Sequence, residues 1–427
     1  MMENKSLDTI CLHGGYEPQS GEPNVCPVCI STTFRYNTPE ELARLFDEPE
    51  GGHIYSRLSN PTIGAFEAKM AALEGGTGAL ACASGMAAAA LAVLNVAQAG
   101  DNIISMSTIY GGVYNLFNVT LRKYGIETRF VSPKASDEEI ERLIDERTKV
   151  FFAETIANPA MVVFDFERYT KLLKKYGVLL MIDNTLVTPV LVRPVDYGAN
   201  VVIYSTTKYL DGHAVAVGGL IVDGGNFEFK GNLRYKEFYT PDESYHGMVY
   251  TDACKKDRNA YIFKARLQMM RDFGACMSPF NAFLTNLGVE TLHIRMKRHS
   301  ENALKIAEYL AAHPAIEWVK YPGLIGDENH NLAVKYFEGG FSGMVTVAIK
   351  GGRAKAEDFI RNLKLIRQVT HIADSRTCVL HPASTTHRQL TDEDLINCGI
   401  SDNLVRISVG LESASDLIAD IDQALKG

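Results

Sequence analysis

The segment Ser205-Thr206-Thr207-Lys208 combines residue types that bind phosphate and form imines. It follows the apolar run 201–204, so Lys208 would stand at the carboxyl edge of a parallel sheet, where α/β proteins bind their ligands. The neighbouring hydroxyl groups could hold a phosphate while the lysine amine forms an imine. A lysine alone in a loop is usually a solvated charge. Here the adjacent Ser and Thr hydroxyl groups favour a functional role for Lys208.

An acidic residue, Asp183, ends the strongly apolar run 178–182. If this run and 201–204 are neighbouring parallel strands, Asp183 and Lys208 lie side by side at one edge of the sheet. A carboxylate there could keep a heterocyclic nitrogen protonated, as the pyridine ring of pyridoxal phosphate requires to act as an electron sink. The alternative is an Asp that caps the next turn, which is the commoner role for such a residue taken alone.

The segment Ser84-Gly85-Met86 joins an apolar run at 79–83 to an Ala-rich stretch, as a turn between a strand and a helix would. Free N–H groups and the positive end of a helix dipole at Gly85 would attract a phosphate, although a plain turn explains the same residues. The nearby segment 75–78 is also glycine-rich. It precedes the apolar run and lacks a spaced third glycine, which argues against a dinucleotide site.

Four more residues could contact a planar, phosphorylated ligand. Tyr55 and Arg57 lie in an irregular N-terminal stretch, and a guanidinium suits bidentate contact with phosphate. Tyr110 follows the apolar run 102–106 and could lay its ring on a planar cofactor. Arg406 lies inside an apolar run, where Arg is rarely buried unpaired, so either a ligand carboxylate or a structural salt bridge is expected.

The elements that would position these residues alternate between strand-sized and helix-sized stretches. Apolar runs predict strands at 79–83, 102–106, 128–131, 150–153, 178–182 and 201–204, with helices at 137–147 and 166–176. This alternation predicts crossover connections and a large, mostly parallel sheet in a layered α/β domain. Gly177 after 166–176 is typical of a helix C-cap.

The C-terminal part has a different texture. It predicts a long helix at 279–310, strands at 343–349 and 404–409, and a helix at 354–363. We interpret it as a second, smaller α/β domain. The expected organisation is therefore an N-terminal arm (1–60), a cofactor-binding domain (61–260) and a C-terminal domain (261–427).

The composition of the 427 residues is that of a globular protein, with 46% hydrophobic and 22% charged residues. A net charge of −8 argues against a nucleic-acid partner, which would need a clustered basic face. The longest apolar run, 86–97, is too short to span a bilayer, and 1–16 lacks the apolar core of a signal peptide. We therefore expect a cytoplasmic protein with no membrane partner.

Eight cysteines are scattered along the chain, which indicates reduced thiols. Cys26 and Cys29 form a CxxC that could be redox-active or half of a zinc site. Because no second CxxC and no thioredoxin-like context accompany it, we interpret the spacing as chance and expect no metal.

Seven short segments, in order along nearly the whole chain, resemble the Cys/Met-metabolism family of pyridoxal-phosphate enzymes. That family has the aspartate-aminotransferase-like fold (fold type I). The segments are Tyr55-Ser56-Arg57, Ser84-Gly85-Met86, Asn158-Pro159, Asp183-Asn184-Thr185, Ser205-Thr206-Thr207-Lys208, His381-Pro382-Ala383-Ser384 and Val405-Arg406.

The resemblance implies a role for each matching residue around pyridoxal 5'-phosphate. Lys208 would form the imine with the cofactor, Asp183 would pair with the pyridine nitrogen, Tyr110 would stack on the ring, and Asn158 would contact the ring hydroxyl. The phosphate would be bound by residues of two subunits, namely Ser84, Gly85, Met86, Ser205 and Thr207 from one and Tyr55 and Arg57 from its neighbour.

The resemblance also implies how an amino-acid substrate is held. Arg406 would bind its α-carboxylate, with Tyr55 and Tyr110 beside it, and Lys208, Tyr110 and Asp183 would be the catalytic residues. Family members are usually homotetramers built from dimers that share active sites. A non-catalytic binding protein is the alternative from another class, but such a protein needs no imine-forming amine.

Within the family, 109–117, 244–250 and 278–283 are similar to the O-acetylhomoserine sulfhydrylases. This implies γ-replacement that converts O-acetyl-L-homoserine and sulfide, or a thiol, to L-homocysteine, or methionine, and acetate. The alternatives are a methionine γ-lyase and a cystathionine γ-synthase or γ-lyase. Methionine γ-lyases typically carry a reactive Cys where Gly112 stands in this sequence. A separate departure is the segment at His371, where many relatives have Ser or Asn with Gly.

Overall fold

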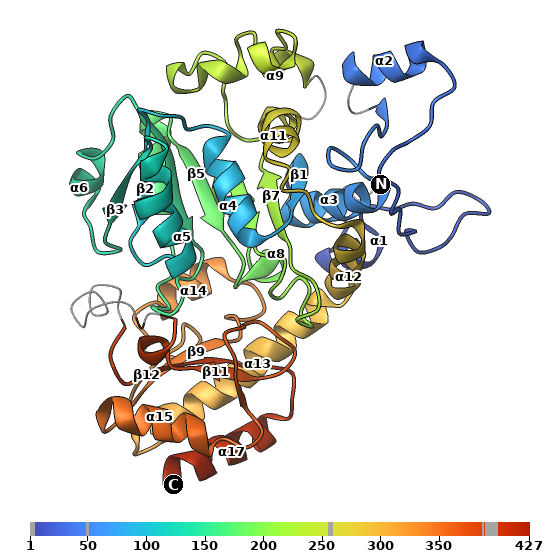
Figure 1. Cartoon of the computed structure of the whole chain (residues 1–427). Helices are drawn as coiled ribbons and strands as arrows, with labels where there is room; N and C mark the ends of the chain where they lie inside the picture. The colour runs from blue at the N-terminus through green and yellow to red at the C-terminus, as the bar shows by residue number, and fades with distance from the viewer. Residues whose placement is uncertain (1–4, 48–50, 255–258, 387, 389–399) are drawn as a thin grey trace.

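The chain folds around two β-sheets, each with its own hydrophobic core, and the smaller sheet lies below the larger one in Figure 1. The computed structural model describes residues 5–47, 51–254, 259–386, 388 and 400–427. Within these residues, no helix is long and apolar enough to cross a membrane.

The larger sheet has seven strands in the order β1-β7-β6-β5-β4-β2-β3. All neighbours pair in parallel except β7, which is antiparallel to both β1 and β6. The strands are β1 (Gly78–Cys82), β2 (Asn102–Met106), β3 (Glu127–Val131), β4 (Thr148–Glu154), β5 (Leu179–Asp183), β6 (Val201–Tyr204) and β7 (Gly219–Asp223). Five consecutive strands are therefore parallel, with their carboxyl ends at one edge.

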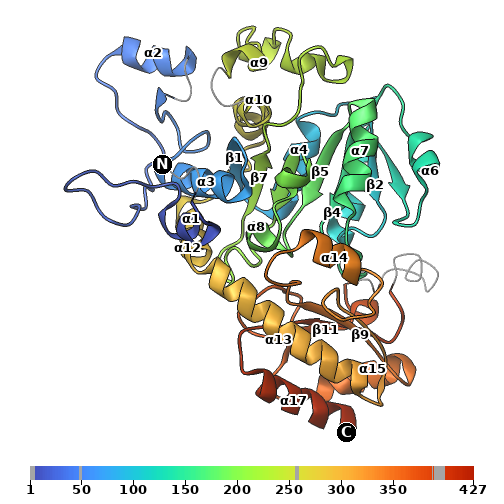
Figure 2. The same ribbon diagram turned by 180° about the vertical axis from the view of Figure 1, so that it is seen from behind.

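Helices cover both faces of this sheet. Helices α4 and α5 lie over one face in Figure 1, and α7 lies over the opposite face in Figure 2. The helices of the N-terminal arm and the larger domain are α1 (Leu7–His13), α2 (Pro39–Asp47), α3 (Pro61–Glu74), α4 (Gly85–Leu94), α5 (Gly111–Asn115), α6 (Asp137–Glu141), α7 (Phe166–Tyr176), α8 (Thr188–Leu191), α9 (Tyr250–Ala253), α10 (Ala260–Lys264) and α11 (Arg271–Phe273).

Shorter helical turns complete these connections. They are the π-helices η2 (Leu116–Leu121) and η6 (Ala265–Met270) and the 3-10 helices η3 (Pro194–Tyr197), η4 (Leu233–Phe238), η5 (Glu243–Tyr245) and η7 (Pro382–Ser384).

Local capping residues set the ends of the helices that flank the sheet. Asn60 accepts hydrogen bonds from the first N–H groups of α3, and Pro61 occupies the first helical position, where its missing N–H costs nothing. Helix α7 begins after Asp165, whose side chain accepts from Arg168 N, and ends at Gly177 with a φ of +61°. The predicted C-cap at Gly177 is therefore confirmed.

The smaller sheet has the order β10-β11-β12-β9-β8 and is antiparallel except between β10 and β11. Its strands are β8 (Ile316–Lys320), β9 (Met344–Ile349), β10 (Arg367–Gln368), β11 (Cys378–Leu380) and β12 (Leu404–Ser408). Its helices are α12 (Pro279–Glu290), α13 (Leu292–Ala312), α14 (His330–Tyr336), α15 (Gly352–Asn362) and α17 (Ala414–Lys426).

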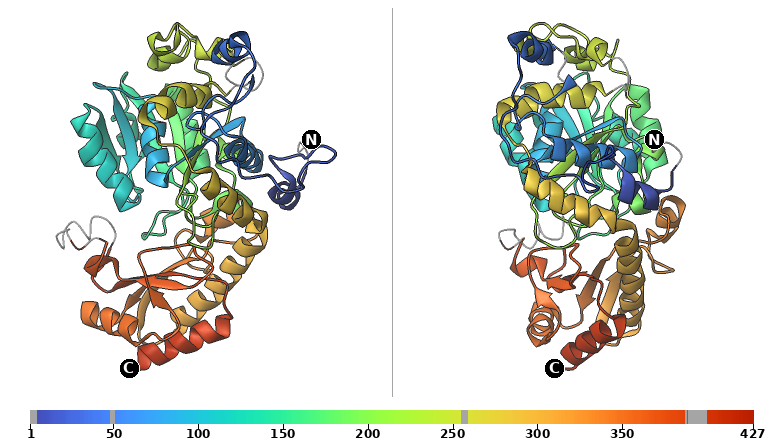
Figure 3. Two further views of the ribbon diagram at one scale, coloured as in Figure 1. Left: turned by 45° about the vertical axis from the view of Figure 1, so that its right-hand side comes forward. Right: turned by 90° about the vertical axis from the view of Figure 1, so that its right-hand side faces the viewer.

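Helix α13 joins the two cores. Leu292 and Met296 pack in the core of the larger sheet, whereas Ala303 and Ile306 pack in that of the smaller one. The helix runs from one part to the other in both views of Figure 3. Because one continuous helix is buried at both ends, it fixes the position of the smaller sheet relative to the larger.

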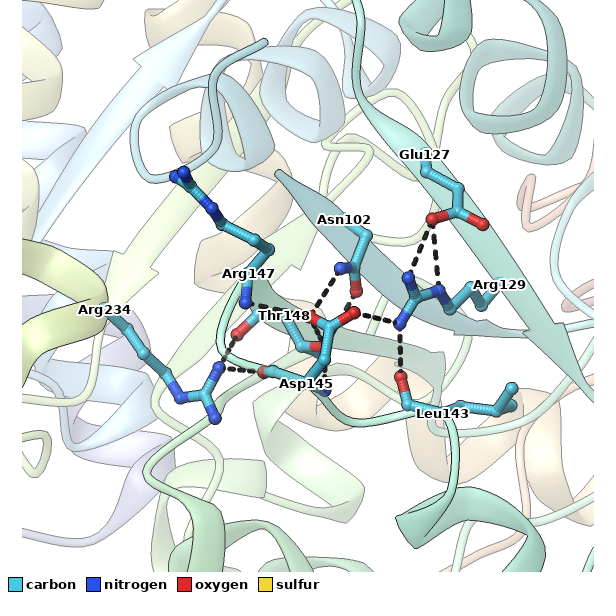
Figure 4. A network of polar contacts seen from close by, with 8 residues as sticks. All are labelled: Asn102, Glu127, Arg129, Leu143, Asp145, Arg147, Thr148 and Arg234. Carbon is cyan, nitrogen blue, oxygen red and sulfur yellow. Dashed lines mark hydrogen bonds and ion pairs between the residues drawn. The ribbon is translucent and has the colours of Figure 1, made fainter. Parts of the chain in front are cut away.

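The predicted helix at 137–147 is wrong in length, because α6 ends at Glu141. Asp145 ends the helical path by bonding other groups: its carboxylate accepts from Asn102 Nδ2 (2.9 Å), Arg129 Nη1 (2.7 Å) and the backbone N–H of Arg147 (2.8 Å). Figure 4 shows this network, which ties the α6–β4 turn to β2 and β3. An Asp that bonds nearby backbone favours a turn over a helix.

The single helix predicted at 279–310 is two helices, α12 and α13, that meet at Thr291. The carbonyl of Gly288 accepts from Arg295 Nη2 at 2.6 Å, a bond that competes with a regular helical ladder. Strand β7 was not predicted. Its apolar run Leu220-Ile221-Val222 carries the local signal of a strand, but its antiparallel pairing with β1 joins residues far apart in sequence, which a local pattern does not report.

Candidate active site

Lys208 lies just beyond β6, at the carboxyl edge of the parallel strands, as predicted. Its Nζ is 3.3 Å from Nδ1 of His371, which comes from the smaller domain. Burial, followed by the nearby Arg406 charge, lowers the pKa of the Lys208 amine to about 8. An amine with this pKa is available as a nucleophile or base near neutral pH.

Two carboxylates end neighbouring strands beside this lysine. Asp183 ends β5 and Glu154 ends β4, and they are register partners. Burial raises the pKa of Asp183, and burial together with the Asp183 charge raises the pKa of Glu154. Within the described parts of the chain, neither Asp183 nor Glu154 has an ion-pair partner. Each carboxyl group therefore favours its protonated form unless a cation binds next to it.

The start of α4 forms a cradle for an anion. Ser84 caps the helix by accepting from Ala87 N, and the N–H groups of Gly85 and Met86 have no acceptor in the described structure. A Cβ on Gly85 would lie 2.6 Å from the Cβ of Ser205, so only glycine lets the helix approach the end of β6 this closely. The helix dipole and the free N–H groups favour a phosphate here.

The hydroxyl of Thr207 fixes the opposite side of this cradle. Its Oγ1 donates to Gly218 O at 3.1 Å and accepts from Gly218 N at 3.0 Å. The backbone N–H of Ser205 donates to Thr185 Oγ1 at 2.8 Å, which links the turn after β6 to the turn after β5. The predicted residues Ser84, Gly85, Met86, Ser205 and Thr207 thus come together around the α4 N-terminus.

Arg406 enters the site from β12 of the smaller sheet. It is only 7% exposed, and its Nη1 lies 3.5 Å from Oδ1 of Asn158, while its Nε has no partner among the described residues. Burial lowers its pKa to about 10. The structure shows no salt bridge for Arg406 within the described residues, so a buried guanidinium faces the site without a carboxylate.

Tyr110 stands at the mouth of the site with 51% of its surface exposed. Its backbone N–H donates to Glu154 Oε1 at 2.6 Å. A Cβ on Gly112 would lie 2.5 Å from Cε1 of Tyr110, so the ring occupies the space that any larger residue at 112 would need. Gly112 therefore sets the orientation of Tyr110.

Tyr55 and Arg57 are not joined to Lys208 by any contact within the described structure of this one chain. Tyr55 forms a β-bridge with Thr33 in the arm, the guanidinium of Arg57 lies 5.5 Å from the centre of the Tyr55 ring, and Arg57 donates to the carbonyl of Arg271. The pair therefore forms a tyrosine–arginine unit on the arm.

Sequence reasoning missed two residues of the site, Glu154 and His371. Glu154 Oε2 also accepts from Asn158 N at 3.3 Å, so this carboxylate holds the Tyr110 and Asn158 turns together. The signal that identified Asp183, an acid ending an apolar strand, was present at Glu154 as well. The segment at His371 stood out only as a departure from many relatives, and its contact with Lys208 gave no local signal because the two residues are 163 positions apart.

Cys26 and Cys29 are both free thiols. Among the residues that the structure describes, no group of three or more His, Cys, Asp or Glu side chains is placed to hold a metal ion.

The site fits pyridoxal phosphate on three structural grounds. The α4 cradle offers unbonded N–H groups where a phosphate would sit, an unpaired carboxylate stands at Asp183 for a pyridine nitrogen, and the Lys208 amine has a lowered pKa. Arg406 adds a buried cation with a free Nε for a substrate carboxylate. These groups are those that the cofactor and an amino acid need.

The chain is similar in sequence to known proteins over nearly its whole length. The chain is 45% identical to an O-acetyl-L-homoserine sulfhydrylase of Leptospira meyeri (100% of this chain, 98% of that protein) and 43% identical to a homocysteine synthase of Schizosaccharomyces pombe (100% and 99%). It is 44% identical to O-acetyl-L-homoserine sulfhydrylase 1 of Thermus thermophilus (98% and 99%).

Solved structures agree with the fold. The metY protein of Campylobacter jejuni, whose structure contains a pyridoxyl-lysine monophosphate, superposes with a TM-score of 0.95 at 36% identity over 99% of this chain and all of that one. The metB protein of Corynebacterium glutamicum gives 0.85 at 34% identity over 100% and 99%. The family model described as Cys/Met metabolism PLP-dependent enzyme matches residues 8–426. This chain is therefore a pyridoxal-phosphate-dependent enzyme of the Cys/Met metabolism family.

Proposed function

We propose that this enzyme makes L-homocysteine and acetate from O-acetyl-L-homoserine and sulfide, or methionine when a thiol replaces sulfide. The observation that carries this proposal is 43–45% identity, along the whole chain, to proteins named O-acetyl-L-homoserine sulfhydrylase and homocysteine synthase. Gly112 supports it, because a Cβ there would meet the Tyr110 ring, and methionine γ-lyases typically carry a Cys at this place.

Pyridoxal phosphate supplies an electron sink to the reaction when it is bound. Four groups of the chain would hold it: Lys208 at the aldehyde, Asp183 at the pyridine nitrogen, Asn158 at the ring hydroxyl and the α4 cradle at the phosphate. Asp183 suits its role because an unpaired, buried carboxylate gains most from a neighbouring cation.

Lys208 acts as the base in two steps. Its free amine removes the proton from Cα of the substrate, and bound pyridoxal phosphate would take up that proton together with the electron pair. The amine, neutral again, then removes a proton from Cβ, and the electron pair left at Cβ forms a Cβ=Cγ double bond as acetate leaves with the electrons of the Cγ–O bond. The sulfur of sulfide then forms a bond to Cγ, and the protons return to Cβ and Cα. A lysine pKa of about 8 leaves part of the amine neutral at pH 7–8 for this work.

Arg406 orients the substrate and Tyr110 flanks it. The Arg406 guanidinium binds the α-carboxylate, with its unpaired Nε as one donor, and the contact with Asn158 holds it in place. Tyr110 would cover the cofactor ring and would assist proton transfer beside the departing acetate. In the proposed site, Tyr55 of the neighbouring subunit lies near Arg406 and Tyr110.

The proposal includes shared active sites in a homotetramer built from two dimers. Tyr55 and Arg57 project on an irregular arm and contact no other proposed site residue of their own chain within the described residues. In a dimer, these residues of the neighbouring subunit would complete the phosphate site. The N-terminal arm of one subunit would thus help to bind the cofactor phosphate in the active site of the other.

We further propose the chain division at 1–60, 61–260 and 261–427, a cytoplasmic location, and partners limited to small molecules and copies of the same chain, with no nucleic acid or membrane among them. The separate cores of the two sheets support the division, although α12 and the first turns of α13 pack on the first core. The net charge of −8 supports the absence of a nucleic-acid partner.

A substrate comparison tests the function. O-acetylhomoserine, O-succinylhomoserine and methionine are each offered to the loaded enzyme with and without sulfide, and homocysteine and 2-oxobutyrate are measured. We expect homocysteine from O-acetylhomoserine plus sulfide as the fastest reaction. Release of 2-oxobutyrate from methionine, with no homocysteine from O-acetylhomoserine plus sulfide, would overturn the proposal in favour of a γ-lyase.

A further inference from the structure

Within the described structure, His371 is the one side chain that forms a hydrogen bond with the Lys208 amine, with 3.3 Å between Nδ1 and Nζ. At pH 7 an amine with a pKa of about 8 is mostly protonated, so it donates to Nδ1. The proton of a neutral imidazole is then on Nε2. That atom is buried and has no partner among the described residues, so nothing there competes for the tautomer.

The loop that carries His371 is fixed to the loop that carries Lys208. Both the N–H and the hydroxyl of Ser375 donate to Gly212 O (2.8 and 2.7 Å), and Arg376 Nη2 donates to His213 O at 2.8 Å. Gly212 N in turn donates to Lys208 O at 2.7 Å. The smaller domain thus binds the backbone of the turn that carries Lys208, and its His371 side chain contacts the Lys208 amine.

The same loop is also held from its own sheet. Ala373 has a φ of +61°, which is strained for a residue with a Cβ, and its N–H donates to Ser408 Oγ at 2.7 Å. Cys378 Sγ donates to the carbonyl of His371 at 3.2 Å. Because the loop that carries His371 is hydrogen-bonded on both sides and strained at Ala373, the position of the His371 imidazole is tightly restricted.

We propose that His371 is a positioning residue that holds the free amine of Lys208 through a hydrogen bond to Nδ1. The contact concerns the amine when it is not bonded to the cofactor, which is the form that moves protons in the proposed function, and the inference rests on that function. By accepting one N–H of the ammonium, the imidazole fixes the direction of the remaining donors. Neutral imidazole suits this role because it adds no charge beside Arg406.

The charges around His371 favour the neutral form. Burial, followed by the Lys208 cation, lowers its pKa, and Arg376 acts in the same direction, whereas Asp374 and Asp211 raise it. Arg406 and the Cys378 thiol face the Lys208 amine from β12 and β11. Two cations, Lys208 and Arg406, already share the site, so a third charge on His371 is disfavoured.

The test measures the pKa of the Lys208 amine in the cofactor-free protein. Acetic anhydride reacts only with the neutral amine, so labelling of the Lys208 peptide across pH, read by mass spectrometry, gives its titration. His371→Leu removes the acceptor and should lower this pKa by about one unit, which raises the neutral fraction of the amine, and with it the labelling rate at pH 7, about fivefold. His371→Asn, which keeps an acceptor near the Nδ1 position, should leave the titration unchanged.

His381→Asn is the matched control, because His381 is also a buried histidine of the smaller domain but bonds Ser384 and Asp402 instead of Lys208. It should leave the Lys208 titration as in the wild type. Identical titrations in His371→Leu and the wild type would overturn the proposal, as would an equal shift in His371→Leu and His381→Asn.

A second measurement does not depend on the folding of His371→Leu. In Lys208→Met, loss of the cation should raise the pKa of His371, which NMR follows in the apoprotein, because coupling between two sites is reciprocal. An unchanged His371 pKa would contradict the contact. In the loaded enzyme, His371→Leu should lower kcat more than it changes KM.

Failure of this inference is distinguishable from failure of the proposed function. Borohydride reduction of the loaded wild type, followed by peptide mapping, shows which lysine holds the cofactor. A lysine other than Lys208 would refute the proposed function, whereas the labelling result would still report whether His371 binds the Lys208 amine.

Discussion

Glu154 and Asp183 occupy the same register position on the neighbouring parallel strands β4 and β5, and neither carboxylate has a cationic partner within the described residues. Burial raises the pKa of both, and the Asp183 charge adds to the rise at Glu154. Two like charges at one sheet edge are unfavourable until a cation arrives. The site is therefore prepared electrostatically for a protonated ring nitrogen.

Glu154→Gln should flatten the pH dependence of apoprotein stability. Carboxyl groups with raised folded pKa values bind more protons when folded, so the free energy of unfolding falls as pH rises above about 4. Removing one of the two groups should reduce that fall by up to about 1.4 kcal/mol per pH unit. Urea unfolding of both proteins between pH 4 and 8 measures it.

Glu308→Gln, a change at an exposed residue of α13, is the control and should leave the slope unchanged. Parallel curves for Glu154→Gln and the wild type would show that the pair does not ionise as described. Cofactor binding should also flatten the wild-type curve, because the ring cation neutralises Asp183.

Lys208→Met should stabilise the apoprotein at neutral pH. A lysine pKa of about 8 in the folded state, against 10.5 ordinarily, means that folding opposes the charged amine below pH 8. The difference in free energy of unfolding should be about 3 kcal/mol at pH 7, and it should shrink to zero as pH rises from 8 to 10.5. The loaded variant should show no turnover and no visible absorbance of a lysine-bound cofactor.

Lys174→Met, an exposed change on α7, serves as the comparison and should show no such convergence. A constant offset between Lys208→Met and the wild type across pH 7 to 10.5 would contradict the lowered lysine pKa.

Arg406→Lys should raise KM for O-acetylhomoserine about 10- to 100-fold with a smaller change in kcat. Lysine keeps the charge but cannot offer the planar, two-point contact of guanidinium to a carboxylate. Initial rates over a range of substrate concentrations measure the two constants. Arg353→Lys, which alters a bond to the carbonyl of Ala383 in the smaller domain, should change neither, and an unaltered KM in Arg406→Lys would remove Arg406 from substrate binding.

Gly112→Ala and Gly112→Cys should each lower kcat/KM about tenfold with a loss of stability below about 1 kcal/mol. The added Cβ would be 2.5 Å from the Tyr110 ring, and this half-exposed ring can move aside without disturbing the core. Gly64→Ala is the matched control, because a Cβ there meets nothing within 4 Å. Full activity in Gly112→Ala would show that the ring position is unimportant for turnover.

Mixed oligomers of Arg57→Ala and Lys208→Ala should regain activity that each variant lacks. If the arm completes the neighbouring site, a hybrid dimer contains one site with both residues intact, so random mixing should restore about a quarter of wild-type activity. Coexpression with two different tags produces the mixture, pull-down through each tag verifies that hybrids form, and activity is measured on the whole mixture. Activity no higher than the average of the two parents would place Arg57 and Lys208 in the same chain.

The sequence by itself determined the residues that stand at strand ends and in tight turns. Lys208, Asp183 and the Ser84-Gly85 turn could be predicted because each follows an apolar run, and parallel strands bring their carboxyl ends to one edge. Arg406 could be singled out because a guanidinium within an apolar strand is rarely buried without a partner. These signals lie within a few residues along the chain.

Only the tertiary structure decided which distant groups meet. Strand β7 pairs antiparallel between β1 and β6, Glu154 is set beside Asp183 by strand order, and His371 reaches Lys208 across 163 residues through the fixed small domain. Such contacts depend on how separate elements pack, and burial and neighbouring charge then set the pKa values of Lys208 and Asp183. A local sequence pattern does not report how distant elements pack, and therefore it does not report the electrostatic environment that this packing creates around each titratable group.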